Sequence, residues 1–326
     1  MKIKFFHFLC LSTLLLTSLS LQTEAAILFQ HGRIRDADEV ATMPVQEHFS
    51  RGVAAMNCRD WDEAYKEFRI VVVNFPDSSF APDSYFYLGI AYYNLGDFDF
   101  ANEAFSDYLK VQNNPTYFEE TLKFKFSIAQ KFKEGARKHM FGTKYLPKWA
   151  SGQSVALSTY DEVIAALPCH EIAAKALYSK GELLWEMRDY RESIDCFQTI
   201  TRRFSKNEFA PQSYLAITEI YLEQSRMEFQ NPDILALAQI NLRRFKHDFP
   251  RDERIEEAES NVQEIKEVYA QGLYDTGMFY ERVKKPYSSV LYYKNAINQF
   301  PETKVAQHCR QRLCALGESD TENTEG

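Results

Sequence analysis

The sequence lacks the short motifs that mark the common catalytic and nucleotide-binding sites. Its 326 residues contain no G-x-S-x-G, no H-E-x-x-H, no P-loop and no G-x-G-x-x-G. The seven histidines are scattered and share no spacing that would suit metal ligands. From these absences we expect a protein that is not an enzyme and that uses no metal and no cofactor.

Paired cysteines, positive charge and long apolar runs are also missing. The six cysteines form no C-x-x-C pair, and their irregular spacing does not indicate a disulfide framework. The net charge is −8, so the chain has no general basic surface, and we expect no nucleic-acid partner. Beyond the first 25 residues no segment approaches the ~18 apolar residues needed to cross a bilayer.

The N-terminus has the composition of a secretory signal peptide. Lys2 and Lys4 supply positive charge, residues 5–21 are mostly apolar, and small residues permit cleavage after Ala25. The sequence therefore predicts export. Two alternatives stay open: the segment is kept as a membrane anchor, or Cys10 is lipidated, although the residues before Cys10 are larger than a lipidation site prefers.

The stretch from Pro82 to Gln112 has the pattern of a helical hairpin. Gly89 lies in an L-G-x-x-Y sequence, Gly96 interrupts the pattern, and Ala101 starts an A-x-x-x-F sequence. This pattern is typical of a tetratricopeptide repeat. Small residues let the two helices of a hairpin approach closely, and neighbouring hairpins must then cover the remaining apolar faces.

Similar patterns recur along the chain and end in the related sequences NFP, ALP, RFS, DFP and QFP. Proline stops a helix because it lacks an N–H and disfavours helical geometry at the residue before it. The sequence predicts an all-α fold, a tetratricopeptide-type superhelix (α-solenoid) of about six hairpins. It should include a long penultimate helix within residues 251–285 and a C-terminal cap. We expect no strands, since no useful alternating pattern is present.

These patterns predict the following division of the chain: a signal peptide (1–25), a linker (26–44), an N-terminal repeat pair (45–116), middle helical repeats (117–206) with a loop at 139–153, a C-terminal repeat block (207–316) and a disordered acidic tail (317–326). The loop is interpreted either as a connector between hairpins or as a partner-contact segment. The second interpretation arises because Tyr145, Lys148 and Trp149 combine aromatic area with positive charge.

Two blocks of the sequence resemble the BamD (YfiO) family of tetratricopeptide lipoproteins, which take part in outer-membrane protein assembly in Gram-negative bacteria. The first block is YKEFRIVVVNFPDSSFAPDSYFYLGIAYYNLGDFDFANEAF, and the second runs from IEEAESNVQEIKEVYAQGLYDTGMFYERV to KVAQ. The resemblance implies a periplasmic scaffold at the inner face of the outer membrane. Its implied partners are a BamA-like β-barrel insertase and unfolded outer-membrane proteins. The alternative is an exported adaptor of another envelope complex, in division or secretion.

Candidate binding residues follow from the first helix of each hairpin, which lines the inner surface of such repeats. In the first two repeats they are Phe49, Met56, Asn57, Phe86, Ile90, Tyr93 and Asn94. The two asparagines share one repeat position, so they either bind the backbone or carboxylate of an extended peptide or cap their helices. The resemblance implies that these repeats receive C-terminal signals of unfolded outer-membrane proteins. It also implies that the last repeats dock the insertase, with Tyr274, Met278 and Arg282 as candidates.

Overall fold

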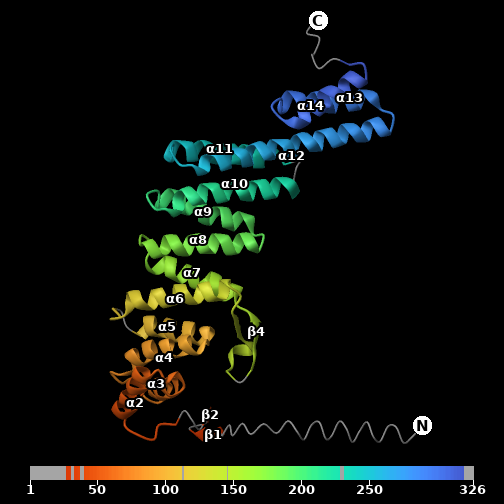
Figure 1. The fold of residues 1–326 in the computed structure, drawn as a ribbon. Helices are drawn as coiled ribbons and strands as arrows, with labels where there is room; N and C mark the ends of the chain where they lie inside the picture. Colours follow the sequence, from red (N-terminus) through yellow and green to blue (C-terminus); the bar gives the residue numbers. More distant parts are fainter. Residues whose placement is uncertain are drawn as a thin grey trace, which may run out of the picture. The chain divides into compact units, whose positions relative to one another are not determined.

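The structure is a computed structural model that describes residues 27–30, 33–36, 40–111, 114–144, 146–227 and 231–318. The predicted signal peptide, Cys10, Tyr145 and most of the predicted acidic tail lie outside the described residues. Within them the chain forms 13 α-helices and two small strand pairs (Figure 1). The predicted all-α, tetratricopeptide-type fold is confirmed. The chain divides into two units, residues 1–121 and 122–326.

Unit 1 contains two helical hairpins whose successive helices pack on one another (Figure 1). Its helices are α2 (Val45–Cys58), α3 (Trp61–Asn74), α4 (Ala81–Leu95) and α5 (Phe98–Val111). The α3 helix starts where the Asp60 side chain accepts the Glu63 N–H at 3.1 Å. The α4 helix ends at Gly96, whose φ of 75° suits glycine.

Unit 2 contains the remaining helices, and α6 carries the boundary between the units. In chain order they are α6 (Phe118–Lys133), α7 (Gln153–Ala166), α8 (Glu171–Glu186), α9 (Tyr190–Arg203), α10 (Phe209–Met227), α11 (Pro232–Asp248), α12 (Arg254–Arg282), α13 (Pro286–Gln299) and α14 (Lys304–Ala315). The α12 helix has 29 residues and is the long helix that the sequence predicts, although two helices follow it. Of the helices described, none is both long and apolar enough to cross a membrane.

Four hairpins share one close contact, in which a glycine of the first helix meets an aromatic ring 16 residues later in the second. A Cβ atom built on each glycine would lie 2.5 to 2.9 Å from that ring, closer than real Cβ atoms come. The pairs are Gly52–Phe68, Gly89–Phe105, Gly181–Phe197 and Gly277–Tyr293. The constant spacing is the sequence counterpart of one packing geometry, repeated in both units.

Replacing Gly181 with alanine tests this contact. The added methyl group would lie 2.9 Å from the fully buried ring of Phe197, and overpacking of this kind costs about 1–3 kcal/mol. Alanine favours a helix by about 1 kcal/mol over glycine, which offsets only part of the cost. We expect a lower free energy of unfolding in urea denaturation. In the double variant Gly181→Ala/Phe197→Leu the loss should be smaller than the sum of the two single losses. A stabilised Gly181→Ala variant would argue against the close approach.

The expectation that the chain has no strands was wrong in two places. Part of the predicted linker forms β1 (Ile27–Gln30) and β2 (Arg33–Asp36), which pair antiparallel. The predicted loop at 139–153 overlaps a second antiparallel pair, β3 (Arg137–His139) and β4 (Lys148–Ser151), with an irregularity in register after Lys138. Strands of three or four residues offer too few positions for an alternating pattern to be distinguished from a loop.

Candidate partner-binding site

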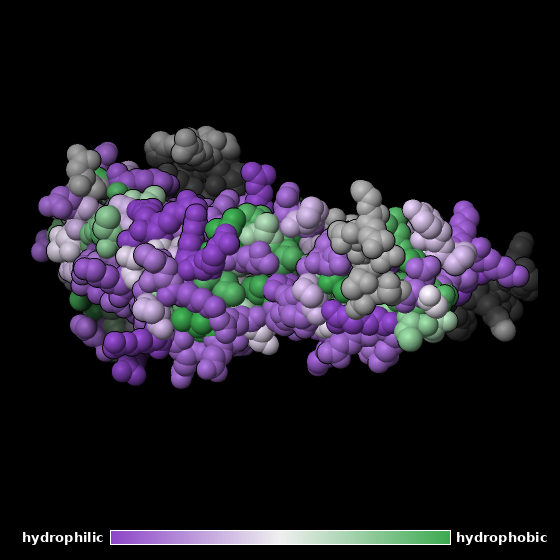
Figure 2. Space-filling view, turned by 90° about the horizontal axis from the view of Figure 1, so that it is seen from above, coloured by the Kyte–Doolittle hydropathy of each residue, from purple (hydrophilic) through white to green (hydrophobic). Residues whose placement is uncertain are grey.

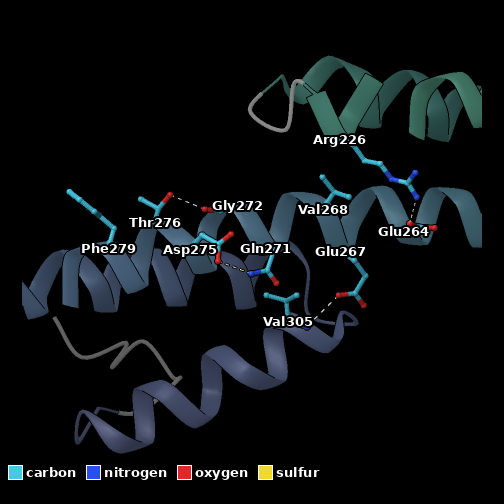
Figure 3. A pocket seen from close by; sticks show the side chains of 10 residues that line it. All are labelled: Arg226, Glu264, Glu267, Val268, Gln271, Gly272, Asp275, Thr276, Phe279 and Val305. Carbon is cyan, nitrogen blue, oxygen red and sulfur yellow. Dashed lines mark hydrogen bonds and ion pairs between the residues drawn. The ribbon is translucent and has the colours of Figure 1, made fainter. Parts of the chain in front are cut away.

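Unit 2 has two hollows lined by the first helices of successive hairpins. Figure 2 shows one face of the molecule, on which hydrophobic residues gather in patches between hydrophilic ones. The larger hollow, which we call the α12 groove, measures about 700 Å³ and is lined by α10, α12 and α14 (Figure 3). The smaller, the α8 pocket, measures about 470 Å³ and is lined by α8, Arg188 and α10. First helices form the inner surface on which repeat proteins bind partners.

One face of α12 supplies most of the α12 groove. Its lining residues recur at intervals of three or four along the helix, which brings them onto a single stripe (Figure 3). The stripe consists of Glu264, Val268, Gln271, Asp275 and Phe279. Arg226 of α10 and Val305 of α14 complete the groove from the two sides. The groove therefore combines apolar surface with carboxylates.

Carboxylates outnumber cations in the α12 groove by three to one, a formal balance of −2. Arg226 forms an ion pair with Glu264 at 2.5 Å. Glu267 accepts the backbone N–H groups of Lys304 at 2.7 Å and Val305 at 3.3 Å, so it caps α14. Asp275 accepts one hydrogen bond, from Gln271 at 2.7 Å (Figure 3). The uncompensated charge of the groove is therefore negative.

The α8 pocket has the same sign of charge. Glu182, Glu186 and Glu223 line it together with the single cation Arg188. The Glu223 carboxylate accepts hydrogen bonds from the Trp185 indole N–H at 2.7 Å and from a tyrosine hydroxyl at 2.8 Å. The bond from Trp185, and after it the bond from the tyrosine, hold the pKa of Glu223 below its usual range, against the opposing effect of burial. Glu223 is therefore ionised at neutral pH.

The structure places most of the unit 1 candidates in or against the core. Phe86 is only 5% exposed, and its ring stacks on Tyr117 with the centroids 4.3 Å apart. As a partner contact, Phe86 is therefore corrected to a core residue. Phe49, Met56, Ile90 and Tyr93 are half-buried; Phe49 packs against Phe80 and Tyr93 against Phe98. Asn57 and Asn94 are exposed.

The two asparagines lie at equivalent positions, but neither occupies the cap. Each stands two residues before the left-handed residue that ends its helix, which is Arg59 in α2 and Gly96 in α4. The Asn94 amide donates to the carbonyl of Ile90 at 2.8 Å. The alternative that these residues act as C-caps is therefore wrong in position, and Asn94 instead supports the last turn of its own helix.

Replacing Asn94 with alanine should cost about 0.5–1 kcal/mol, the net value of one hydrogen bond to the backbone. Asn57→Ala is the matched control. Asn57 is equally exposed, and the described residues include no such bond from its side chain. We expect the control to change the free energy of unfolding by less than about 0.5 kcal/mol. Thermal unfolding followed by circular dichroism measures both variants, and equal effects would mean that the Asn94 bond contributes nothing.

The candidates near the C-terminus flank the α12 groove without lining it. Tyr274 is half-buried, with its ring 5.6 Å from that of Tyr293, and Met278 is half-buried against the core. Arg282 is exposed at the end of α12. The sequence analysis missed the neighbouring residues Asp275 and Phe279, which belong to the stripe. The signal that could have found them is a helix face on which acidic and large apolar residues alternate.

Comparisons with known proteins agree with the fold. Two family profiles described as tetratricopeptide repeat match residues 49–117 and 174–207. The solved structure of a repeat protein from Bacteroides fragilis NCTC 9343 is similar, with TM-score 0.42 and 11% identity over 84% of this chain and 100% of that chain. A tetratricopeptide repeat protein from Parabacteroides merdae ATCC 43184 has TM-score 0.35 and 13% identity over 81% and 96%. PilF from Pseudomonas aeruginosa has TM-score 0.30 and 12% identity over 71% and 97%. Among curated proteins, none matches the sequence significantly.

The family assignment depends on the profiles and on the packing. One profile match lies in unit 1 and the other in unit 2. Both matched regions contain the contact between a glycine and an aromatic ring 16 residues later. The chain is therefore a tetratricopeptide repeat protein.

Proposed function

We propose that this protein is an exported scaffold that binds other polypeptides on the inner surface of its repeats and serves the assembly of outer-membrane β-barrel proteins. The observation that carries the general part is the α12 groove, because three successive first helices line it. Tetratricopeptide repeats imply protein partners in general. Binding, rather than a chemical reaction, is the activity that such a groove suits.

The specific part of the proposal has a different support. Residues 65–105 and 255–307 resemble the BamD family, and the first 25 residues have the composition of an export signal. We therefore propose a periplasmic location at the inner face of the outer membrane. The proposed partners are a BamA-like insertase and unfolded outer-membrane proteins.

Affinity isolation tests this proposal. The full chain, tagged at its C-terminus, is purified from detergent-solubilised membranes of its own host, and we expect a β-barrel insertase to be recovered with it. Depletion of the protein should lower the amount of folded β-barrel proteins in the outer membrane. Recovery of a division or secretion complex instead, with unchanged β-barrel levels, would overturn the assembly role and favour the alternative adaptor.

The mature N-terminus provides a separate test of the proposed location. Mass spectrometry of the purified protein should find cleavage after Ala25. An acylated Cys10 would also support an envelope protein, but one anchored by lipid. An intact N-terminus in a protein found only in the cytoplasm would contradict export.

A further inference from the structure

We infer that the α12 groove binds a basic polypeptide segment that carries at least one large apolar side chain. This inference rests on the proposed function as a polypeptide-binding scaffold and specifies the chemistry of the partner. The argument uses three properties of the groove: its length, its balance of charge and the exposed aromatic ring of Phe279.

The groove has the dimensions of a short peptide site. Its stripe extends from Glu264 to Phe279 on α12, and 15 helical residues span about 22 Å at 1.5 Å each. An extended chain covers that distance with about seven residues at ~3.3 Å per residue. The volume of about 700 Å³ lies within the range of ligand sites. A segment of this length can therefore contact the whole stripe.

The charges of the groove select a cationic partner. Glu267 and Asp275 have no cation paired with them in the groove, whereas Glu264 is paired with Arg226. The α8 pocket, on the same series of first helices, is also acidic. Each exposed ion pair contributes at most about 1 kcal/mol. The charges therefore decide which segment binds more than how tightly it binds.

The apolar residues of the groove supply the affinity. Phe279 is 52% exposed, an unusual degree for a phenylalanine in a helix that packs against a core. It lies at one end of the stripe, and Val268 and Val305 line the groove with it (Figure 3). Exposed aromatic residues beside a groove are the usual anchors of peptide binding. A large apolar side chain of the partner would cover Phe279.

Two other occupants fit the charge less well. The C-terminal residues of this chain are acidic, with Glu318, Asp320, Glu322 and Glu325, so they would be repelled by the groove. A second copy of the chain would carry a net charge of −8. A basic segment of another protein is the occupant that agrees with the electrostatics.

Peptide binding to the mature full chain tests the inference. The probe is a fluorescein-labelled nonapeptide in which lysine alternates with leucine and phenylalanine, and the matched probe has glutamate in place of every lysine. Fluorescence anisotropy measures both affinities. We expect the lysine peptide to bind at least about tenfold more tightly than the glutamate peptide, and its affinity to fall as salt is added.

Substitutions then locate the site. Asp275→Lys and Phe279→Ala should each weaken binding of the lysine peptide by about five- to tenfold. The matched controls are Glu256→Lys, on an exposed part of the same helix outside the groove, and Tyr287→Ala, an 85% exposed aromatic residue on α13. Both controls should stay within about twofold of the wild type. All four positions are exposed, and circular dichroism melting verifies that each variant is folded.

The outcomes separate this inference from the proposed function. Unchanged affinity in Asp275→Lys and Phe279→Ala, or equal losses in the controls, would overturn the groove as the binding site. Equal affinity of the two peptides would overturn its preference for basic segments. If the peptide results fail while the insertase is still recovered from membranes, the inference alone is wrong. If the peptide binds the groove but no insertase is recovered, the assembly role is wrong and the groove stands.

Discussion

Replacing Phe197 with alanine should lower the free energy of unfolding of unit 2 by about 3–5 kcal/mol, the usual cost of removing a buried aromatic ring. Phe197 is fully buried in α9. Its ring lies against Gly181, and its centroid is 5.3 Å from that of Tyr178. Because glycine has no side chain that could move into the space, the cavity should remain largely open. Urea denaturation followed by circular dichroism measures the loss.

Trp149→Ala is the control for this prediction. Trp149 is 67% exposed on β4, so its removal should change the free energy of unfolding by less than about 0.5 kcal/mol. In a repeat array each hairpin contacts mainly its neighbours, so the Phe197 effect should be local. Hydrogen exchange should accelerate most in α8, α9 and α10. A loss below 1 kcal/mol for Phe197→Ala, or faster exchange spread equally to α14, would contradict this account of the core.

Alkaline pH should destabilise unit 1 through Tyr92, whose pKa is raised from 10.0 to about 12. Burial is the main cause, and repulsion from Tyr65 and Asp97 adds to it, while Arg69 opposes it. A raised pKa means that the folded state holds its proton more tightly than the unfolded state. The resulting stability is fully present below pH 10 and is lost as the pH rises to 12. Two pKa units correspond to about 2.7 kcal/mol.

Comparison with Tyr92→Phe isolates this contribution from that of other tyrosines. Phenylalanine keeps the ring that stacks on Tyr65 at a centroid distance of 5.5 Å and removes the ionising hydroxyl. Urea denaturation is repeated between pH 8 and pH 12 on both proteins. The wild type should lose more stability than the variant above pH 10, and the two curves should run parallel below it. Parallel curves across the whole range would show that Tyr92 does not ionise differently in the folded state.

The hairpins themselves could be predicted because each is recorded locally in the sequence. Gly89 and Phe105 are 16 residues apart, and so are Gly181 and Phe197. Such a contact needs only two adjacent helices and a short turn, so apolar spacing and helix-stopping residues are sufficient to identify it. The length of α12 could be predicted for the same reason, since no proline interrupts residues 251–285.

Side-chain environments were predicted less well. Phe86 lies on a first helix, as expected, but its ring stacks on Tyr117, which follows α5 and belongs to no predicted hairpin. Helical spacing shows which residues share a face of a helix, but it does not show which segment covers that face. The strands β3 and β4 were missed because their pairing is decided by hydrogen bonds between two segments of three and four residues.

By itself, the sequence determined that this chain is a series of α-hairpins, because the small residues, the aromatic residues and the helix stops of each hairpin lie within some 35 residues of one another. Only the tertiary structure decided where a partner could bind. The α12 groove needs Arg226, the stripe on α12 and Val305 together, and these come from three helices that only packing brings side by side. Packing also left Phe279 exposed while it buried Phe86, a difference that the local spacing of apolar residues does not contain.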